Sequence, residues 1–254
     1  GNGSSVLNIT GTNTISGPVA LALGTLDVDN SSTISGAITH TASSSIDIDS
    51  GYTLNYSGAS IAVGEYTMTL SGDGTFYKTA NFSLGSRESK LNIIGSSTII
   101  SPIVLNGGTL DIDSDVTITG NITHTSSSTI DVASGKTLYY SGDNISLGAY
   151  TMTMQGGGVL SNTNAIKLDD SSSILSIEGE NTISNVIITS DLSTGISISE
   201  SSTISTLTVF ASAPLLISSG KTLSGNLVVR SGGSIKPSST GTIESTLTLS
   251  GGIF

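Results

Sequence analysis

Apolar residues recur in this chain with a period of about 21 residues, always in short segments in which apolar and polar positions alternate. The recurrence forms three rows of twelve positions each. The first row runs through Leu7, Leu26, Ile46, Met68, Leu91, Leu110, Ile130, Met152, Leu175, Ile196, Leu215 and Ile235. The second runs through Ile15, Ile34, Leu54, Phe76, Ile99, Ile118, Leu138, Leu160, Ile183, Ile204, Leu223 and Ile243. The third runs through Val19, Ile38, Ile61, Phe82, Ile103, Ile122, Ile145, Ile166, Ile187, Leu207, Leu227 and Leu247.

Three rows of this kind predict three inward-facing strand segments in each of about twelve coils. Alternation along a strand puts one side chain inside and the next outside. One coil cannot bury its own apolar residues, so coils must stack as parallel strands about 4.8 Å apart around a continuous core. We therefore predict an all-β fold, a single-stranded parallel β-helix (β-solenoid) that forms one continuous domain over residues 1–254. A β-sandwich is the alternative, although it does not require such regular rows.

A longer repeat contains four of these coils. Residues 24–29 recur almost unchanged as residues 108–113, and residues 66–69 recur as residues 150–153, in both cases at the same offset. We therefore expect three super-repeats, over residues 7–90, 91–174 and 175–254, of which the third has diverged. Residues separated by this offset occupy equivalent positions of successive super-repeats.

Composition narrows the class of protein. The 254 residues include 8 Lys and Arg against 19 Asp and Glu, a net charge of −11, and no cysteine. An acidic surface repels nucleic acid and anionic lipid, so neither is an expected partner. Without cysteine there is no disulfide framework and no thiolate chemistry. The longest apolar runs are too short for a transmembrane helix, so we expect no transmembrane segment.

Aspartates alternate with the apolar residues of the first row in several coils. They are Asp27, Asp29, Asp47 and Asp49 in one group and Asp111, Asp113 and Asp131 in another. We expect each group to form an exposed carboxylate patch on adjacent coils, where like charges about 5 Å apart repel. A hard cation such as Ca²⁺ would relieve that repulsion, which makes these seven residues candidate metal ligands and Ca²⁺ the only candidate cofactor. A solvated acidic face that keeps the protein soluble is the simpler interpretation.

Threonine precedes the second-row residue in eleven of the twelve coils, and Val159 replaces it in the other. These side chains should point outward and form a row of hydroxyls that suits β-structure. Ice binding is the functional alternative, because a flat threonine array can order water.

The two histidines, His40 and His124, each fall two residues after a member of the third row, at equivalent positions of the first two super-repeats. We expect them inside the coil or at a corner, as hydrogen-bonded core residues too far apart to share a metal ion. The acids repeat with the structure instead of converging on one place, so we expect no enzymatic activity.

The regular coils of residues 4–250 resemble the right-handed parallel β-helices of bacterial adhesins, including autotransporter passengers and filamentous-haemagglutinin-type proteins. The resemblance implies right-handed winding, secretion, display at the bacterial cell surface, and a role in adhesion or as a stalk. Phage tail fibres and polysaccharide-active enzymes share this architecture, so a polysaccharide-binding or polysaccharide-degrading β-helix is the alternative function, beside an ice-binding solenoid.

The ends of the predicted solenoid bear on its partners. An open end exposes unpaired strand edges and core residues. Residues 1–6 and 248–254 do not have the pattern of a helical or polar cap. We therefore expect either neighbouring coils of a longer chain or end-to-end self-association into a filament, with surface glycans as further candidate partners.

Overall fold

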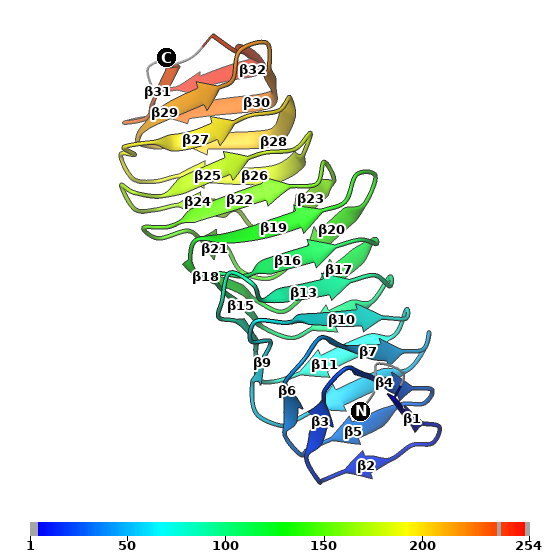
Figure 1. Ribbon diagram of the computed structural model, residues 1–254. Coiled ribbons are helices and arrows are strands. Elements are labelled where there is room, and N and C mark those ends of the chain that lie inside the picture. The colour runs from blue at the N-terminus through cyan, green and yellow to red at the C-terminus, as the bar shows by residue number, and fades with distance from the viewer. Residues whose placement is uncertain (1–4, 238–239, 252–254) are drawn as a thin grey trace. The chain divides into compact units, whose positions relative to one another are not determined.

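The structure of the chain is a computed structural model that describes residues 5–237 and 240–251. It divides into two compact units, residues 1–123 and 124–254. The described residues form strands joined by turns and contain no helix. Accordingly, none of them belongs to a helix long and apolar enough to cross a membrane. Figure 1 shows the strands of each unit stacked one above the next.

The first unit consists of two main parallel sheets and a third set of short strands. The first sheet is formed by β1 (Ser5–Ile9), β4 (Gly24–Val28), β7 (Ser44–Ile48), β10 (Thr67–Ser71), β13 (Lys90–Ile93) and β16 (Thr109–Ile112). The second is formed by β2 (Thr14–Ile15), β5 (Ser32–Ile34), β8 (Thr53–Tyr56), β11 (Thr75–Lys78), β14 (Thr98–Ile100) and β17 (Val116–Ile118). The short strands are β3 (Val19–Leu21) with β6 (Ile38–His40), and β9 (Ile61–Ala62) with β12 (Phe82–Leu84) and β15 (Ile103–Asn106). The next strand, β18 (Ile122–Ser126), lies across the boundary between the units.

The second unit repeats this plan. Its first sheet is formed by β19 (Ser128–Val132), β22 (Thr151–Gln155), β25 (Ile174–Ile177), β27 (Gly195–Ile198), β29 (Ser212–Ile217) and β31 (Ser234–Pro237). Its second is formed by β20 (Thr137–Tyr140), β23 (Val159–Asn162), β26 (Thr182–Ile188), β28 (Ser202–Val209), β30 (Thr222–Arg230) and β32 (Thr242–Ser250). The short strands β21 (Ile145–Ser146) and β24 (Ile166–Leu168) complete the earlier coils.

Together the two units contain about 12 turns, and their main sheets pair strands that are three positions apart along most of the chain. This confirms the predicted all-β parallel β-solenoid. Right-handed winding, the three super-repeats as structural units and a single continuous domain over residues 1–254 stay predictions.

The interior is filled by the predicted rows. Burial alternates along the strands, as in β7 and β19, where the first, third and fifth residues are buried. Leu26, Leu54 and Ile61 are fully buried members of the three rows. Leu7 on β1 and Leu247 on β32 are exceptions, with exposed fractions of 47% and 40%, because each strand has a paired neighbour on one side only among the described residues. Alternation therefore located the core correctly in the coils that are covered on both sides, with the exception of Ile187 on β26.

In the first and second rows the pairing register differs from the prediction at several steps, by two residues in each of the following examples. Ile46 lies opposite Leu70 instead of Met68, and Ile130 lies opposite Met154 instead of Met152. Because side chains on a strand change face with a period of two, a two-residue shift keeps every apolar residue inside. The spacing of apolar residues therefore predicts which face is buried and leaves the register open.

The later coils have two strand segments where the sequence predicted three. From β26 onward, the second and third segments join into strands of seven to nine residues. The earlier turn contains Gly17 and Pro18, whereas the corresponding Asn185 and Val186 two super-repeats later do not force the chain to turn. In β26 the inward position belongs to Val186, not to the predicted Ile187.

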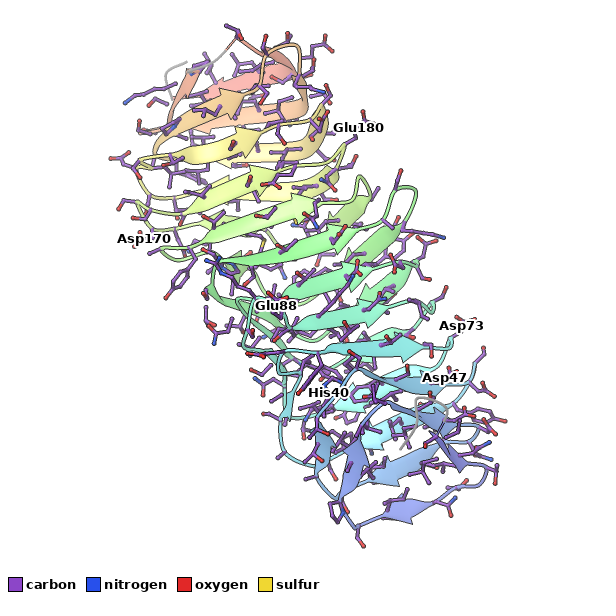
Figure 2. The ribbon with its side chains drawn as sticks, in the orientation of Figure 1. His40, Asp47, Asp73, Glu88, Asp170 and Glu180 are labelled. Carbon is purple, nitrogen blue, oxygen red and sulfur yellow. The ribbon has the colours of Figure 1, made fainter. Side chains whose placement is uncertain are left out.

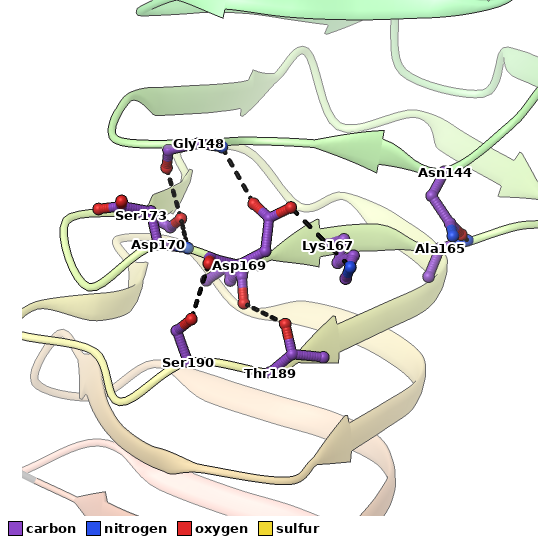
Figure 3. A network of polar contacts seen from close by, with 10 residues as sticks. Asn144, Gly148, Ala165, Lys167, Asp169, Asp170, Ser173, Thr189 and Ser190 are labelled. Carbon is purple, nitrogen blue, oxygen red and sulfur yellow. Dashed lines mark hydrogen bonds and ion pairs between the residues drawn. The ribbon is translucent and has the colours of Figure 1, made fainter.

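Side chains at the corners join each coil to the next. In Figure 3, Gly148 N donates to Asp169 Oδ1 at 3.1 Å, and the Ser173 hydroxyl donates to the carbonyl of Gly148 at 2.5 Å. The Ser190 hydroxyl of the following coil donates to the Asp169 carbonyl at 2.7 Å. Such bonds satisfy backbone groups where the strands end and the chain turns.

Candidate functional site

Four aspartates from two adjacent strands meet on the outer surface of the first unit. Asp27 on β4 lies directly opposite Asp47 on β7, which Figure 2 labels. Asp29 and Asp49 follow them two residues later. Burial raises the pKa of the Asp27 carboxyl, and the charges of Asp29, Asp47 and Asp49 and a hydrogen bond with Asp29 raise it further. We call these four residues the acidic cluster, and its members interact electrostatically as the sequence predicted.

The second predicted group of aspartates does not form an exposed patch. Asp111 on β16 is 5% exposed, and its carboxylate forms an ion pair with Nζ of Lys90 on the adjacent β13. The expectation of an exposed Asp111 is therefore wrong. Lys90 fills an outward position one residue before the first-row apolar residue, so its amine reaches across to the next strand and partly covers the carboxylate. Asp113 is exposed.

Asp131 belongs to the second unit and also has a partner. On β19 it lies opposite Gln155 of β22, and the Gln155 amide donates to Asp131 Oδ2 at 2.8 Å. Among residues 5–237 and 240–251, no group of three or more His, Cys, Asp or Glu side chains is arranged to hold a metal ion. Calcium binding by the seven aspartates stays a prediction.

The expected row of threonines is continuous over part of each unit. Thr53, Thr75, Thr98 and Thr117 lie opposite one another in successive coils of the first unit. The row shifts by two residues at Thr33, which lies opposite Asn55. The neighbouring outward row contains Asn55, Tyr77 and Ile100 in place of hydroxyls. The structure therefore contains a single hydroxyl row here, and ice binding stays a prediction.

Both histidines occupy the interior, as predicted. His40 and His124 are 8% and 6% exposed, and their Nδ1 atoms hydrogen-bond the carbonyls of Val63 at 2.9 Å and Leu147 at 3.2 Å. Tyr66 and Tyr150 pack edge-on against the two rings. Burial lowers the pKa of both imidazoles, and hydrogen bonds to the backbone oppose that shift in part. These histidines are core residues that favour the neutral ring.

Lys78 is a buried basic residue that the sequence analysis missed. It is 2% exposed, its Nζ donates to the carbonyl of Ala59 at 2.6 Å, and it lies 4.3 Å from the ring centroid of Tyr56. Burial lowers the pKa of its amine to about 8. The equivalent position of the next super-repeat is Asn162, whose amide donates to the carbonyl of Asn185 at 2.9 Å. The alternation of β11 did indicate an inward side chain at this position.

Comparisons with known proteins add no relative: no family model, no curated protein and no solved structure matches this chain. The likeness to bacterial adhesins therefore depends on the repeat pattern of this sequence. What the structure supports is a parallel β-solenoid with acidic and hydroxyl side chains on its outer faces.

Proposed function

We propose that this chain is a structural and adhesive segment of a bacterial surface protein that acts outside the cell. The observation that carries the proposal is the parallel stacking of coils around an apolar interior within each unit. In such a stack each coil hydrogen-bonds to the next along its whole length, so the assembly is stiff and extends by adding coils. A stiff spacer of this kind can present an adhesive surface away from the cell.

The chemistry of the outer surface supports an extracellular setting. Charged residues make up 11% of the chain, and the net charge is −11. Serine, threonine and asparagine occupy most other outward positions of the strands, which provides hydrogen-bonding groups for a polar ligand. Stability needs no disulfide, since the chain has no cysteine, and each coil is held by its neighbours instead.

Two strand edges favour the end-to-end self-association that the sequence led us to expect as one alternative. On β1 the apolar residues Val6 and Leu7 are exposed, and on β32 so are Leu247 and Leu249. Among the described residues each strand pairs on one side, with β4 and β30 respectively. A further coil added in parallel would cover both the apolar residues and the free backbone groups. Residues 1–4 and 252–254, part of the predicted uncapped ends, lie outside the described residues.

Electron microscopy of the purified chain over a concentration series tests this proposal. We expect narrow rods that lengthen into fibres as concentration rises, because each chain that joins an end buries apolar surface and pairs a free strand edge. Replacing Leu247 and Leu249 together with lysine should leave the circular dichroism spectrum unchanged and shorten the fibres. Replacing the exposed Ile94 with lysine is the control. Compact particles at every concentration would contradict a rod-forming segment.

A further inference from the structure

A shallow groove crosses three adjacent strands on the outer surface of the first unit. Its lining comes from the start of β4, β7 and β10 and from the residues just before them. The lining residues are Leu23, Gly24, Thr25, Ser43, Ser44, Ser45, Thr67 and Thr69. Three strands spaced about 4.8 Å apart make the groove roughly 10 Å long, which matches about two sugar rings laid end to end.

Leu23 at one side of the groove has a strained backbone. Its φ of 61° is in the left-handed region, and it is the only residue other than glycine with a positive φ in residues 5–237 and 240–251. The equivalent position of the next super-repeat is Gly107, with a φ of 111°, where a side chain is absent. A branched side chain in this region strains the backbone. The Leu23 side chain is 49% exposed, so packing in the core does not explain why a leucine stands here.

Hydroxyl groups form the rest of the groove. Thr25, Ser45 and Thr69 lie directly opposite one another on β4, β7 and β10 and point outward. Ser44 also borders the groove, but it is 7% exposed and occupies an inward position of β7, so its hydroxyl does not belong to this outward row.

We propose that this groove binds a neutral, linear polysaccharide, an inference that rests on the proposed adhesive function and names its ligand class. Leu23 packs against the C–H face of one sugar ring, and the row Thr25, Ser45 and Thr69 exchanges hydrogen bonds with ring hydroxyls. The acidic cluster begins two residues further along β4 and β7, at Asp27 and Asp47. Its charges repel anionic ligands, which favours neutral sugars over acidic ones.

Titration calorimetry of the full chain with cellohexaose, mannohexaose and isomaltohexaose tests the site. We expect at least one of the three to bind and Leu23→Gly to weaken that binding about tenfold, as loss of one apolar contact does. The same substitution should raise the midpoint of thermal unfolding by about 2 to 4 °C, because glycine adopts a positive φ without strain. Weaker binding by a variant that is more stable would show that Leu23 serves ligand binding and not the stability of the fold.

A second pair of variants tests the hydroxyl row. Thr69→Val removes one hydroxyl and keeps the shape of the side chain, so binding should weaken by about fivefold or more. Thr98→Val on the other sheet and Ile94→Ala, an exposed apolar residue outside the groove, are controls that should bind as the unmodified chain does.

Failure of this inference is distinct from failure of the proposed function. Binding of a hexaose that Leu23→Gly and Thr69→Val leave unchanged would overturn the groove as the site and leave the adhesive role in place. Absence of binding by all three hexaoses would overturn the ligand class. Neither result bears on the rods and fibres that microscopy tests.

Discussion

Burial of the Lys78 ammonium costs free energy that its contacts with Ala59 and Tyr56 recover only in part. The lowered pKa of about 8 is the sign of that imbalance. Its position on β11 faces the interior, where a charge is removed from water. Asn162, at the equivalent position of the next super-repeat, meets backbone groups with a neutral amide, which avoids the cost of a buried charge.

Lys78→Met should therefore stabilise the protein at pH 7 by about 1 kcal/mol or more. In the folded protein the amine has a pKa of about 8, against 10.5 in an unfolded chain. Between these values the unfolded chain binds a proton that the folded protein does not, so the stability of the unmodified protein rises with pH. Urea unfolding at pH 7 and pH 10 should show an advantage of the methionine variant that shrinks at pH 10. An advantage independent of pH would contradict a buried charge at Lys78.

Asp27→Asn should stabilise the protein at pH 7 by about 0.2 to 1 kcal/mol, because it removes the central charge of the acidic cluster. The raised pKa of Asp27 means that the folded protein holds this proton up to a higher pH than the unfolded chain does. Stability contributed by the proton is present at low pH and is lost as pH rises through the folded pKa. The gain from asparagine should therefore disappear near pH 3, where Asp27 is protonated in both states.

Thermal unfolding of Asp27→Asn at pH 3, 5 and 7 measures this effect. Asp113→Asn, at an exposed aspartate outside the cluster, is the matched control and should change stability by less than about 0.5 kcal/mol at each pH. Destabilisation by Asp27→Asn at pH 7 would indicate that the carboxylate makes a favourable contact, such as one with a bound cation.

At the scale of the element, successive coils come so close at some corners that only glycine, which has no side chain, fits there. A Cβ added to Gly95 would lie 1.8 Å from the carbonyl oxygen of Gly72 in the preceding coil, whereas a Cβ on Gly85 would have no atom within 4 Å. The chain therefore contains glycines that the stacking requires and glycines that it does not. Sequence inspection does not separate them, because both occur in similar turns rich in serine and glycine.

Gly95→Ala should destabilise the first unit by about 2 to 4 kcal/mol, since the turns at Gly72 and Gly95 are held together by the paired strands before them, β10 and β13, and after them, β11 and β14. Gly85→Ala should leave stability unchanged or raise it by up to about 1 kcal/mol, because alanine restricts the unfolded chain. Chemical denaturation of the two variants side by side measures the difference. Equal effects would mean that the corner at Gly95 is looser than the strand register indicates.

For the whole molecule, charge opposes the association that the strand edges favour. A net charge of −11 repels a second copy of the chain. Salt shortens the range of that repulsion, to about 10 Å at 0.1 M and about 3 Å at 1 M. Light scattering should therefore show more association at 500 mM NaCl than at 20 mM, while backbone pairing and apolar contact at the edges are little affected by salt. Association that falls as salt rises would mean that ion pairs hold the copies together.

The sequence by itself determined the fold class, the number of coils and the face that nearly every strand segment buries; the end of β26, where Val186 and not Ile187 faces inward, is the exception. These properties depend on two periods, the alternation within a strand and the return of the apolar segments once per coil, and both can be read locally. The same reasoning placed His40 inside the coil. It also placed Asp27 next to Asp47, because β4 and β7 pair in the register that the apolar rows predict, with Leu26 opposite Ile46.

Only the tertiary structure decided the pairing register, the merging of two strand segments into one from β26 onward, and which individual polar side chains are buried and with what partners. A shift of two residues preserves every buried face, so the apolar pattern cannot distinguish Met68 from Leu70 as the partner of Ile46. Asp111 is buried because Lys90 on the adjacent strand reaches it, and Lys78 is tolerated inside because a carbonyl and a ring meet its amine. Such outcomes depend on which side chains the stacking brings together, and that is a property of pairs of coils rather than of one stretch of sequence.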